Sequence, residues 1–370
     1  MQAEPFKELR IAIIGTVGVP GCYGGFETLA QNLVEFHFRQ NLESKLLIYC
    51  SSTSYPKPRT LQYKSAQLRY LPFKANGVQS ILYDSISLLD AIRWKATHIL
   101  ILGVSAGFLL PWISRLAKVR LVVNTDGMEW KRNKWNIWVK QFLKFSEKAA
   151  VSGAHILIAD NIGIQNYLKR AYSRESVFIP YGGDHALYSG TAIPDHLNLP
   201  KEYFLALCRI EPENNVELIL EAWQFLEIPL VFVGNWQANT LGQSLWRKYN
   251  RYPHIHLLNS IYDPGHLNHI RLHAKAYIHG HSAGGTNPAL VEMMHYGSPV
   301  IAWDCEYNRN TTEGKALYFN SQPSLLEIIS RMDDGLNAVV GDSMRQIAVN
   351  RYMWSKVASS YFELLSNHRN

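Results

Sequence analysis

Cysteine is scarce in this chain of 370 residues, which has four cysteines and no C-x-x-C pair. Their scatter excludes a disulfide framework and a cysteine zinc site, and it favours a reducing compartment. The longest apolar run, residues 99–113, is too short for a membrane span and is broken by glycine and proline. Residues 1–9 are charged and lack the apolar core of a signal peptide. We therefore expect a cytoplasmic protein.

Several motifs of common enzyme classes are also missing. The first glycine-rich loop has Gly15, Gly18 and Gly21 spaced G-x-x-G-x-x-G, which is neither the dinucleotide fingerprint nor the phosphate-loop motif. This weighs against a dehydrogenase and a phosphate-loop nucleotidase. The chain has no Asp-x-Asp motif of the kind that holds a metal–diphosphate. Three histidines on one helical face lack the spacing and carboxylate of a metal site: His266, His269 and His273.

The chain is rich in apolar residues and carries a net positive charge. Hydrophobic residues make up 47% and charged residues 18%, which supports well-formed cores. The formal net charge of +7 favours acidic partners such as nucleotide diphosphates, anionic lipid or nucleic acid. A chain of this length has two domains of ordinary size as its first expectation.

Buried strands alternate with helix-length segments along the whole chain. A strand at 10–15, a glycine-rich loop at 16–25 and a helix at 26–38 open the pattern. Further strands are expected at 45–49, 68–70, 98–102, 120–124, 155–159, 176–179, 203–207, 230–233, 256–258, 276–278 and 299–302. This alternation predicts an α/β protein with doubly wound parallel sheets.

A turn-rich segment divides the pattern into two α/β halves. We expect a first domain at 1–185, a linker at 186–202, a second domain at 203–345, and a C-terminal helix at 346–370 that returns to the first domain. Ligands of such sheets bind beyond the carboxyl ends of the strands. The loops that follow strands are therefore expected to face one crevice: 15–25, 208–215, 234–235 and 282–287.

The stretch from His279 to Asn310 carries the most chemistry. Its loop of small residues, 282–285, leads into a helix expected to start at Asn287 and Pro288. The exposed backbone N–H groups and the helix dipole suit a phosphate or diphosphate, and Glu292 can accept hydrogen bonds from sugar hydroxyls. The alternative is a β-loop-α crossover whose glycines only permit a tight turn.

Two shorter stretches also follow strands. Arg209 can grip a diphosphate bidentately beside Asn214 and Asn215, or the segment is a charged turn with Asn215 as a helix cap. Asp126 can enter the crevice as a base or hydroxyl acceptor, or it forms an Asx-turn before Gly127.

Aromatic and cationic side chains interleave between Trp130 and Lys148. Such a stretch suits an anionic membrane surface, with the rings at headgroup depth. The same aromatics are equally compatible with packing against the sheet. Nucleic acid is not an expected partner, because no recognition motif accompanies the charge.

Five blocks, taken together, resemble a known family: residues 11–28, 124–132, 209–215, 232–236 and 281–292. The chain is similar to retaining GT-B glycosyltransferases, in particular bacterial rhamnosyltransferases of capsule and O-antigen assembly. The resemblance implies the GT-B fold, in which two Rossmann-like, doubly wound parallel-sheet domains face a central cleft. It also implies transfer of a sugar from a nucleotide-sugar donor, which is a co-substrate, with no cofactor and no metal.

The resemblance assigns roles residue by residue. Gly24 and Gly25 lie against the donor diphosphate from the N-terminal side and Arg209 holds it from the other. Glu292 matches the ribose-binding second glutamate of the family's E-x7-E motif. The implied donor-binding residues are Gly24, Gly25, Arg209, Asn214, Asn235, Gly284, Gly285, Thr286, Asn287 and Glu292. The expected catalytic residues are Arg209 and, for placing the acceptor, Asp126.

Two departures from the wider family bear on the donor. Gly284 stands where the family has its first glutamate, and Asn214 stands where it has a lysine. Both changes are compatible with a deoxysugar that has fewer hydroxyls, such as rhamnose on dTDP.

The expected partners follow from this assignment. They are a nucleotide-sugar donor, a saccharide acceptor on polyprenyl diphosphate, and the anionic inner face of the cell membrane, where the protein is peripheral. Two alternatives stay open: a nucleotide-sugar 2-epimerase on the same fold, and a non-catalytic protein that binds glycan.

Overall fold

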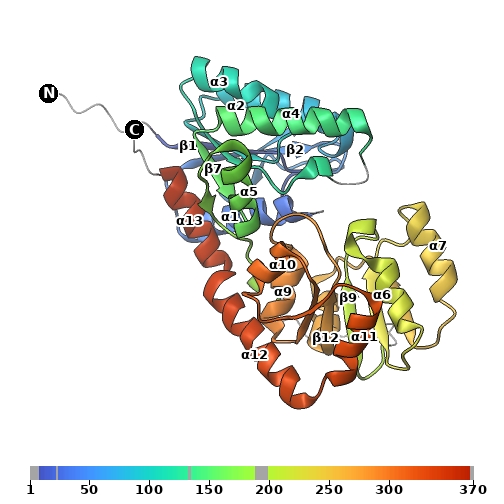
Figure 1. Ribbon diagram of the computed structural model, residues 1–370. Helices are drawn as coiled ribbons and strands as arrows, with labels where there is room; N and C mark the ends of the chain where they lie inside the picture. The colour runs from blue at the N-terminus through green and yellow to red at the C-terminus, as the bar shows by residue number, and fades with distance from the viewer. Residues whose placement is uncertain (1–7, 22–23, 132–134, 188–198, 367–370) are drawn as a thin grey trace. The chain divides into compact units, whose positions relative to one another are not determined.

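The computed structural model describes residues 8–21, 24–131, 135–187 and 199–366 (Figure 1). The chain divides into two compact units, one of residues 1–179 with 355–370 and one of residues 180–354. The segment expected to return to the first domain, 346–370, is shared between them. Helix α12 (Asp334–Arg351) belongs to the second unit, and α13 (Trp354–Ser366) belongs to the first from Ser355 onward.

The first unit contains an eight-stranded sheet in the order β3-β4-β2-β1-β5-β6-β7-β8. Its strands are β1 (Arg10–Ile14), β2 (Lys45–Ser51), β3 (Gln62–Tyr63), β4 (Ala66–Leu71), β5 (His98–Leu102), β6 (Arg120–Asn124), β7 (Ile156–Ala159) and β8 (Val177–Phe178). All neighbours are parallel except β3 and β4. Central strands such as β5 are buried along their whole length, because helices cover both faces of the sheet.

The helices of this unit form two layers (Figure 1). Helices α2 (Ser80–Arg93), α3 (Leu110–Leu116) and α4 (Ile137–Gly153) lie together, and α1 (Gly25–Arg39), α5 (Ile162–Tyr172) and α13 lie apart from them. Phe362 of α13 stacks on Phe36 of α1 at 5.9 Å, and Tyr361 receives a hydrogen bond of 3.2 Å from Asn124 at the end of β6. The last helix therefore completes the core of the first unit.

The second unit has a six-stranded parallel sheet in the order β11-β10-β9-β12-β13-β14. Its strands are β9 (Tyr203–Leu207), β10 (Leu230–Gly234), β11 (Ile255–Asn259), β12 (Ala274–His279), β13 (Val300–Trp303) and β14 (Leu317–Phe319). Its helices are α6 (Val216–Trp223), α7 (Thr240–Tyr249), α8 (Pro264–Leu272), α9 (Pro288–Tyr296), α10 (Glu306–Thr311), α11 (Gln322–Arg331) and α12. Large aromatics fill its core: Phe204, Trp223, Phe232 and Trp236.

Two doubly wound α/β units confirm the expected fold class. The order of the strands reverses next to the first strand of each unit, between β1 and β5 and between β9 and β12. Ligands of open α/β sheets bind beyond the carboxyl ends of the strands at such a point. Within the described ranges, no helix is both long enough and apolar enough to cross a membrane.

Candidate functional site

The loops that follow β9 and β12 are bonded to each other in the second unit. The backbone N–H of Ser282 donates to the carbonyl of Glu213 at 2.8 Å, and Asn215 Nδ2 donates to the carbonyl of Gly280 at 2.8 Å. These bonds bring the arginine-bearing loop and the glycine-rich loop together at the point where the strand order reverses. The topology of the parallel sheet predicts this meeting, and the structure confirms it.

Gly280 makes this close approach possible, although no role was predicted for it. A Cβ atom at this position would lie 2.1 Å from the carbonyl oxygen of Asn214 and 2.9 Å from Ile219. No real side chain tolerates such a contact with backbone, so only glycine fits here.

Asn214 and Asn235 hold the arginine-bearing loop from within. Asn214 is buried, its Nδ2 donates to the carbonyl of Arg209 at 2.7 Å, and its Oδ1 lies 2.6 Å from Nδ1 of His281. Asn235 Oδ1 accepts from the backbone N–H of Ile210 at 2.7 Å. Both residues are among the predicted donor-binding residues, and their contacts within the protein fix the backbone around Arg209.

Arg209 itself remains half-exposed. Its Nη2 atom lies 3.6 Å from Oε2 of Glu211, and 41% of its side chain is accessible. A guanidinium in this position is available to an incoming anion, and a diphosphate offers it more oxygen acceptors than a carboxylate does.

The glycine-rich loop leads into α9 as expected. Asn287 is the N-cap, with its Oδ1 accepting from the backbone N–H of Ala289 at 3.0 Å, and Pro288 is the first helical residue. Gly284 has φ +95°, a backbone conformation that favours glycine. Thr286 is buried, while Gly285 and Asn287 are partly exposed. The start of α9 thus presents backbone N–H groups and the positive end of the helix dipole.

Glu292 on α9 is 12% exposed and lies between an arginine and a histidine. Its Oε2 pairs with Nη2 of the buried Arg271 on α8, and its Oε1 lies 3.3 Å from Nε2 of His185. Burial alone would raise the pKa of the Glu292 carboxyl, but Arg271, followed by His185, lowers that pKa below its ordinary value. A carboxylate has about four lone-pair sites, so two stay available for the hydroxyls of a ribose.

His279 ends β12 at the same edge of the sheet. Its Nδ1 lies 3.2 Å from the hydroxyl of Tyr277, and burial, with His281 nearby, lowers the pKa of the imidazole well below its ordinary value. His279 is therefore uncharged beside the two loops. The pattern His279-Gly280-His281 is the sequence feature that could have indicated this position, and no role was predicted for it.

Comparisons with known proteins agree with this geometry. Residues 192–316 match the family described as glycosyl transferases group 1, and residues 9–184 match a domain of unknown function. The glycosyl transferases group 1 match covers most of the second unit. The chain has no match among curated proteins.

Solved structures of low sequence identity share the whole fold. Sucrose-phosphate synthase from Thermosynechococcus elongatus is 16% identical with a TM-score of 0.80, over 96% of this chain and 98% of that one. HepE of Anabaena in complex with UDP is 14% identical with a TM-score of 0.72, over 97% and 100%. A glycosyltransferase of Rickettsia africae is 12% identical with a TM-score of 0.71, over 97% and 98%. The chain therefore has the GT-B fold.

In the first unit, the loop after β1 is ordered by Glu27. Glu27 Oε1 accepts from the backbone N–H of Val17 at 2.6 Å and from the hydroxyl of Thr16 at 3.0 Å. Burial raises the pKa of this carboxyl, although those hydrogen bonds act in the opposite direction. Gly24, the N-cap of α1, has φ +89°, and Gly25 begins the helix. Gly24 and Gly25 thus lie where the strand order of the first sheet reverses.

Asp84 is a second buried carboxyl at this edge that the sequence did not indicate. Burial raises the pKa of Asp84 to about 8, and a hydrogen bond with Ser105 only partly offsets this. Its Oδ1 has no hydrogen-bond partner within the described part of the chain. Its neighbour Tyr83 donates to the carbonyl of Thr16 at 3.0 Å, which places α2 against the same loop.

Asp126 follows β6 and is partly exposed. It has φ +61°, and its backbone N–H donates to Oδ1 of Asn124 at 3.0 Å. The Asx-turn in this segment is therefore made by Asn124, and the Asp126 side chain is not its acceptor.

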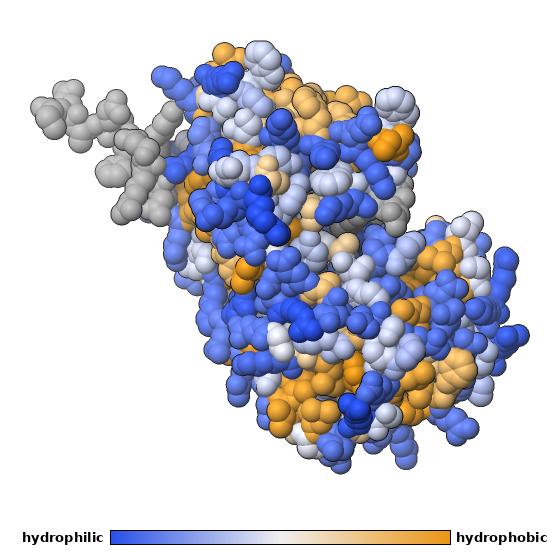
Figure 2. Space-filling view, in the orientation of Figure 1, coloured by the Kyte–Doolittle hydropathy of each residue, from blue (hydrophilic) through white to orange (hydrophobic). Residues whose placement is uncertain are grey.

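The aromatic and cationic stretch separates into packed and exposed parts. Trp135 donates to Glu129 at 3.0 Å, and the ammonium of Lys144 lies 5.0 Å from the centre of the Trp130 ring. Trp138 and Phe145 on α4 are 76% and 60% exposed. Hydrophobic side chains gather over α2, α3 and α4 (Figure 2), and the most exposed of them are Val78, Leu82, Leu89, Trp112, Leu116, Ile137, Trp138 and Phe145. Residues 132–134 of the stretch lie outside the described residues.

Histidines and carboxylates do not gather into a metal site in the described ranges. His269 and His273 stack with ring centres 4.3 Å apart, and His273 Nδ1 lies 2.8 Å from the carbonyl of His269. His266 and His269 lie on α8, and His273 follows as its C-cap residue.

Proposed function

We propose that this glycosyltransferase transfers L-rhamnose from dTDP-rhamnose, with retention and without a metal, to a saccharide on polyprenyl diphosphate during synthesis of a bacterial surface polysaccharide. The observation that carries the proposal is the position of Arg209. It lies on a loop that Asn214 and Asn235 fix, directly bonded to the loop that opens α9.

This arrangement would stabilise the negative charge of the leaving diphosphate. Arg209 supplies a guanidinium, and residues 284–287 with the start of α9 supply backbone N–H groups and the helix dipole. Because these groups are held in place before the reaction, they would stabilise the developing charge with little reorganisation. Glu292 would accept hydrogen bonds from the ribose while Arg271 keeps it ionised.

Gly284 supports a deoxysugar as the donor. A glutamate at this position would offer a sugar two acceptor oxygens, and glycine offers none. Loss of those acceptors favours a sugar with fewer hydroxyls over glucose. The HepE structures that resemble this chain contain UDP, or UDP and glucose, so UDP-glucose is the main competitor of dTDP-rhamnose.

The proposed transfer needs no covalent intermediate on the protein. The acceptor hydroxyl attacks the anomeric carbon from the face that the diphosphate leaves, and a donor phosphate oxygen takes its proton. The products are the glycosylated acceptor and the nucleoside diphosphate. Asp126 would orient the acceptor hydroxyl.

An anionic membrane would present the lipid-linked acceptor. The exposed Ile137, Trp138 and Phe145 of α4, with Lys140 and Lys148 on the same helix, support this part of the proposal. Apolar rings insert at headgroup depth, and cations attract anionic lipid.

A panel of nucleotide sugars, with and without a lipid-linked acceptor, tests the proposal by release of nucleoside diphosphate. We expect acceptor-dependent release that is fastest with dTDP-rhamnose, persists with EDTA, and yields a product of unchanged anomeric configuration. Arg209→Ala should abolish most release, while Arg247→Ala, an exposed arginine of the same unit, should leave it unchanged. Equal release by Arg209→Ala and the wild type would disprove the role of Arg209.

The same panel separates two other functions on this fold. A 2-epimerase would convert the donor without any acceptor. A glycan-binding protein would bind the acceptor and release no diphosphate.

A further inference from the structure

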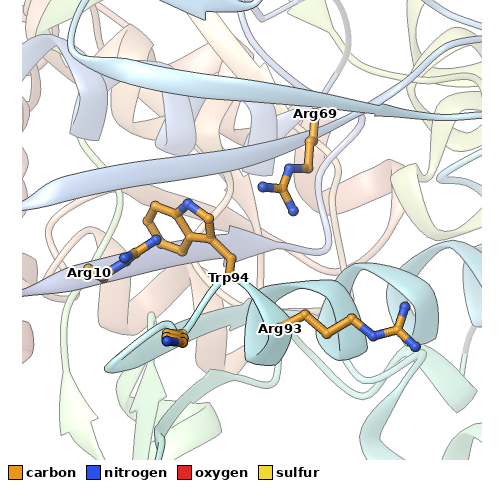
Figure 3. Close-up of a pocket in the computed structure, with 5 residues that line it drawn as sticks. Arg10, Arg69, Arg93 and Trp94 are labelled. Atoms are coloured by element: carbon orange, nitrogen blue, oxygen red, sulfur yellow. The ribbon is translucent and has the colours of Figure 1, made fainter.

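A basic pocket of about 400 Å³ lies in the first unit, away from the loops described above. It is lined by Arg10, Arg69, Arg93, Trp94 and Lys95 (Figure 3). Arg10 is the first residue of β1, and Arg93 to Lys95 end α2 just before β5 begins. The pocket is therefore near the amino ends of the strands, whereas Gly24 and Asp126 follow their carboxyl ends. A five-residue strand separates the two edges by roughly 15 Å.

One of the four cations of this basic pocket is neutralised. Arg69 on β4 forms an ion pair with Asp90 on α2, and Asp90 also accepts from the hydroxyl of Tyr49 at 2.7 Å. Among the residues that the structure describes, no carboxylate forms an ion pair with Arg10, Arg93 or Lys95. The lining therefore keeps three positive charges in excess.

Arg10 is held in place by Trp94. Its guanidinium carbon lies 4.3 Å from the centre of the indole ring, an arrangement that Figure 3 shows from the side. Its Nε is buried and has no hydrogen-bond partner in the described part of the chain. A buried donor without a partner is costly, and a ligand oxygen would satisfy it.

The helix dipole explains only part of this cluster. A cation in the last turn of α2 is favourable at the negative end of the helix, which accounts for Arg93. It does not account for Arg10, which arrives from a strand, or for Lys95, which lies beyond the helix with φ +61°. Like charges brought together repel one another, and a bound anion offsets that repulsion.

We propose that the basic pocket binds a phosphoryl group, as a phosphate or diphosphate ester, at a site separate from the transfer reaction. Guanidinium forks match the oxygens of phosphate, and an ammonium adds a point charge. Arg10, Arg93 and Lys95 contact the ligand, and Arg69, fixed by Asp90, is the positioning residue. The ligand is either a soluble phosphate ester or the phosphate headgroup of a lipid.

Calorimetric titration with inorganic pyrophosphate at constant ionic strength tests the soluble source. The full chain carries Arg209→Ala, so that the proposed donor site does not contribute. We expect saturable binding that becomes weaker by about tenfold or more in Arg93→Gln/Lys95→Gln. The matched control is Arg115→Gln/Lys118→Gln, two exposed cations of which Arg115 lies in the last turn of α3 and Lys118 lies between α3 and β6. The control should bind as the parent does.

Flotation with phosphatidylcholine vesicles, with and without phosphatidate, tests the lipid source. Flotation that requires phosphatidate and is lost only in Arg93→Gln/Lys95→Gln supports a lipid headgroup as the ligand. Saturable pyrophosphate binding with the same variant dependence supports a soluble ester. The proposal is overturned if neither probe binds, or if the control pair weakens binding as much as the pocket pair.

Discussion

The indole Nε1 of Trp354 donates a hydrogen bond of 2.8 Å to Nδ1 of His185. An indole N–H can only donate, so Nδ1 carries no proton and the proton of the neutral imidazole is on Nε2. That atom faces Oε1 of Glu292 at 3.3 Å. Trp354 thus fixes the tautomer in which His185 donates to the carboxylate proposed to bind the ribose.

His185→Ala should weaken binding of dTDP or UDP by about tenfold, because Glu292 loses a charge-assisted hydrogen bond that orients it. His185→Gln, which can still donate, should restore most of the affinity. Trp354→Phe removes the donor that fixes this tautomer, so it should also weaken nucleotide binding. Calorimetric titration measures the dissociation constants of all three variants. Equal affinity in His185→Ala and the wild type would remove the role of this imidazole.

The pair of Glu292 and Arg271 should set the acid stability of the second unit. The pKa of Glu292 is lower in the folded protein than its ordinary value of 4.5, so the unfolded chain binds more protons in this range. The free energy of unfolding gained from this carboxylate is present above pH about 4.5 and is lost as pH falls through the folded pKa.

Glu292→Gln should lower the free energy of unfolding at pH 7 by about 3–5 kcal/mol, because it leaves Arg271 buried without its partner. It should also make the free energy of unfolding depend less on pH below about 4.5. Urea unfolding between pH 3 and 7 measures both effects. If the variant and the wild type lose the same free energy of unfolding as pH falls, other carboxylates cause the acid sensitivity.

Asp84 should affect the free energy of unfolding in the opposite direction to Glu292, because it lowers stability as pH rises. Its pKa is about 8 in the folded protein and near 3.8 when unfolded, so the folded state binds more protons between these values. The free energy of unfolding should fall as pH rises from about 4 to about 8. Asp84→Asn should stabilise the protein at pH 8 by roughly 1 kcal/mol or more and remove this slope. Melting temperatures from pH 5 to 9 report it, with the exposed Asp342→Asn as control; a lower melting temperature for Asp84→Asn at pH 8 would contradict the argument.

Gly280→Ala should separate the two loops of the proposed donor site. The added Cβ meets the carbonyl of Asn214, which should cost about 1–3 kcal/mol of stability. Displacement of Arg209 should reduce diphosphate release by about a hundredfold. Gly335→Ala, at a helical glycine with ordinary φ where the added Cβ would lie 3.4 Å from Oδ1 of Asp333, should instead stabilise by about 0.5–1 kcal/mol. Full activity in Gly280→Ala would show that the contact between the loops is dispensable.

Asp126→Asn should impair use of the acceptor and leave donor binding unchanged. If Asp126 orients the acceptor hydroxyl, kcat/KM for the acceptor should fall by about a hundredfold, while the dissociation constant of the nucleotide stays unchanged. Steady-state kinetics with a lipid-linked acceptor and nucleotide titration measure the two quantities. A matching loss in nucleotide affinity would place Asp126 on the donor instead.

The order of strands and helices could be predicted because it depends on local patterns. Buried strands such as β5 and β6 read as apolar runs at their observed bounds, and Asn287-Pro288 carries the chemistry of a helix start. Two short strands, β3 and β14, were not predicted. Each has three residues or fewer, which is too short for an alternation of apolar and polar residues to be recognised.

The side-chain partners could not be predicted, because they join segments that are far apart in sequence. His185 reaches Glu292 across more than a hundred residues, and Asn214 reaches His281 across 67. The resemblance implied that Asn214 and Asn235 bind the donor. Only the tertiary structure shows that each also makes a hydrogen bond to the backbone of the loop that carries Arg209. The burial of Asp84 has the same origin, because α2 packs against a loop from β1.

The chain passes between its two units twice, after Ile179 and after Trp354, and the two passages are bonded together. The N–H of Gly183 donates to the carbonyl of Tyr352, and the N–H of Trp354 donates to Oδ1 of Asp184. A fragment that stops at residue 179 would lack α13 and leave Phe36 without Phe362. Exchange of one unit between homologous enzymes therefore requires two splice points, and chimaeras joined at a single point should aggregate.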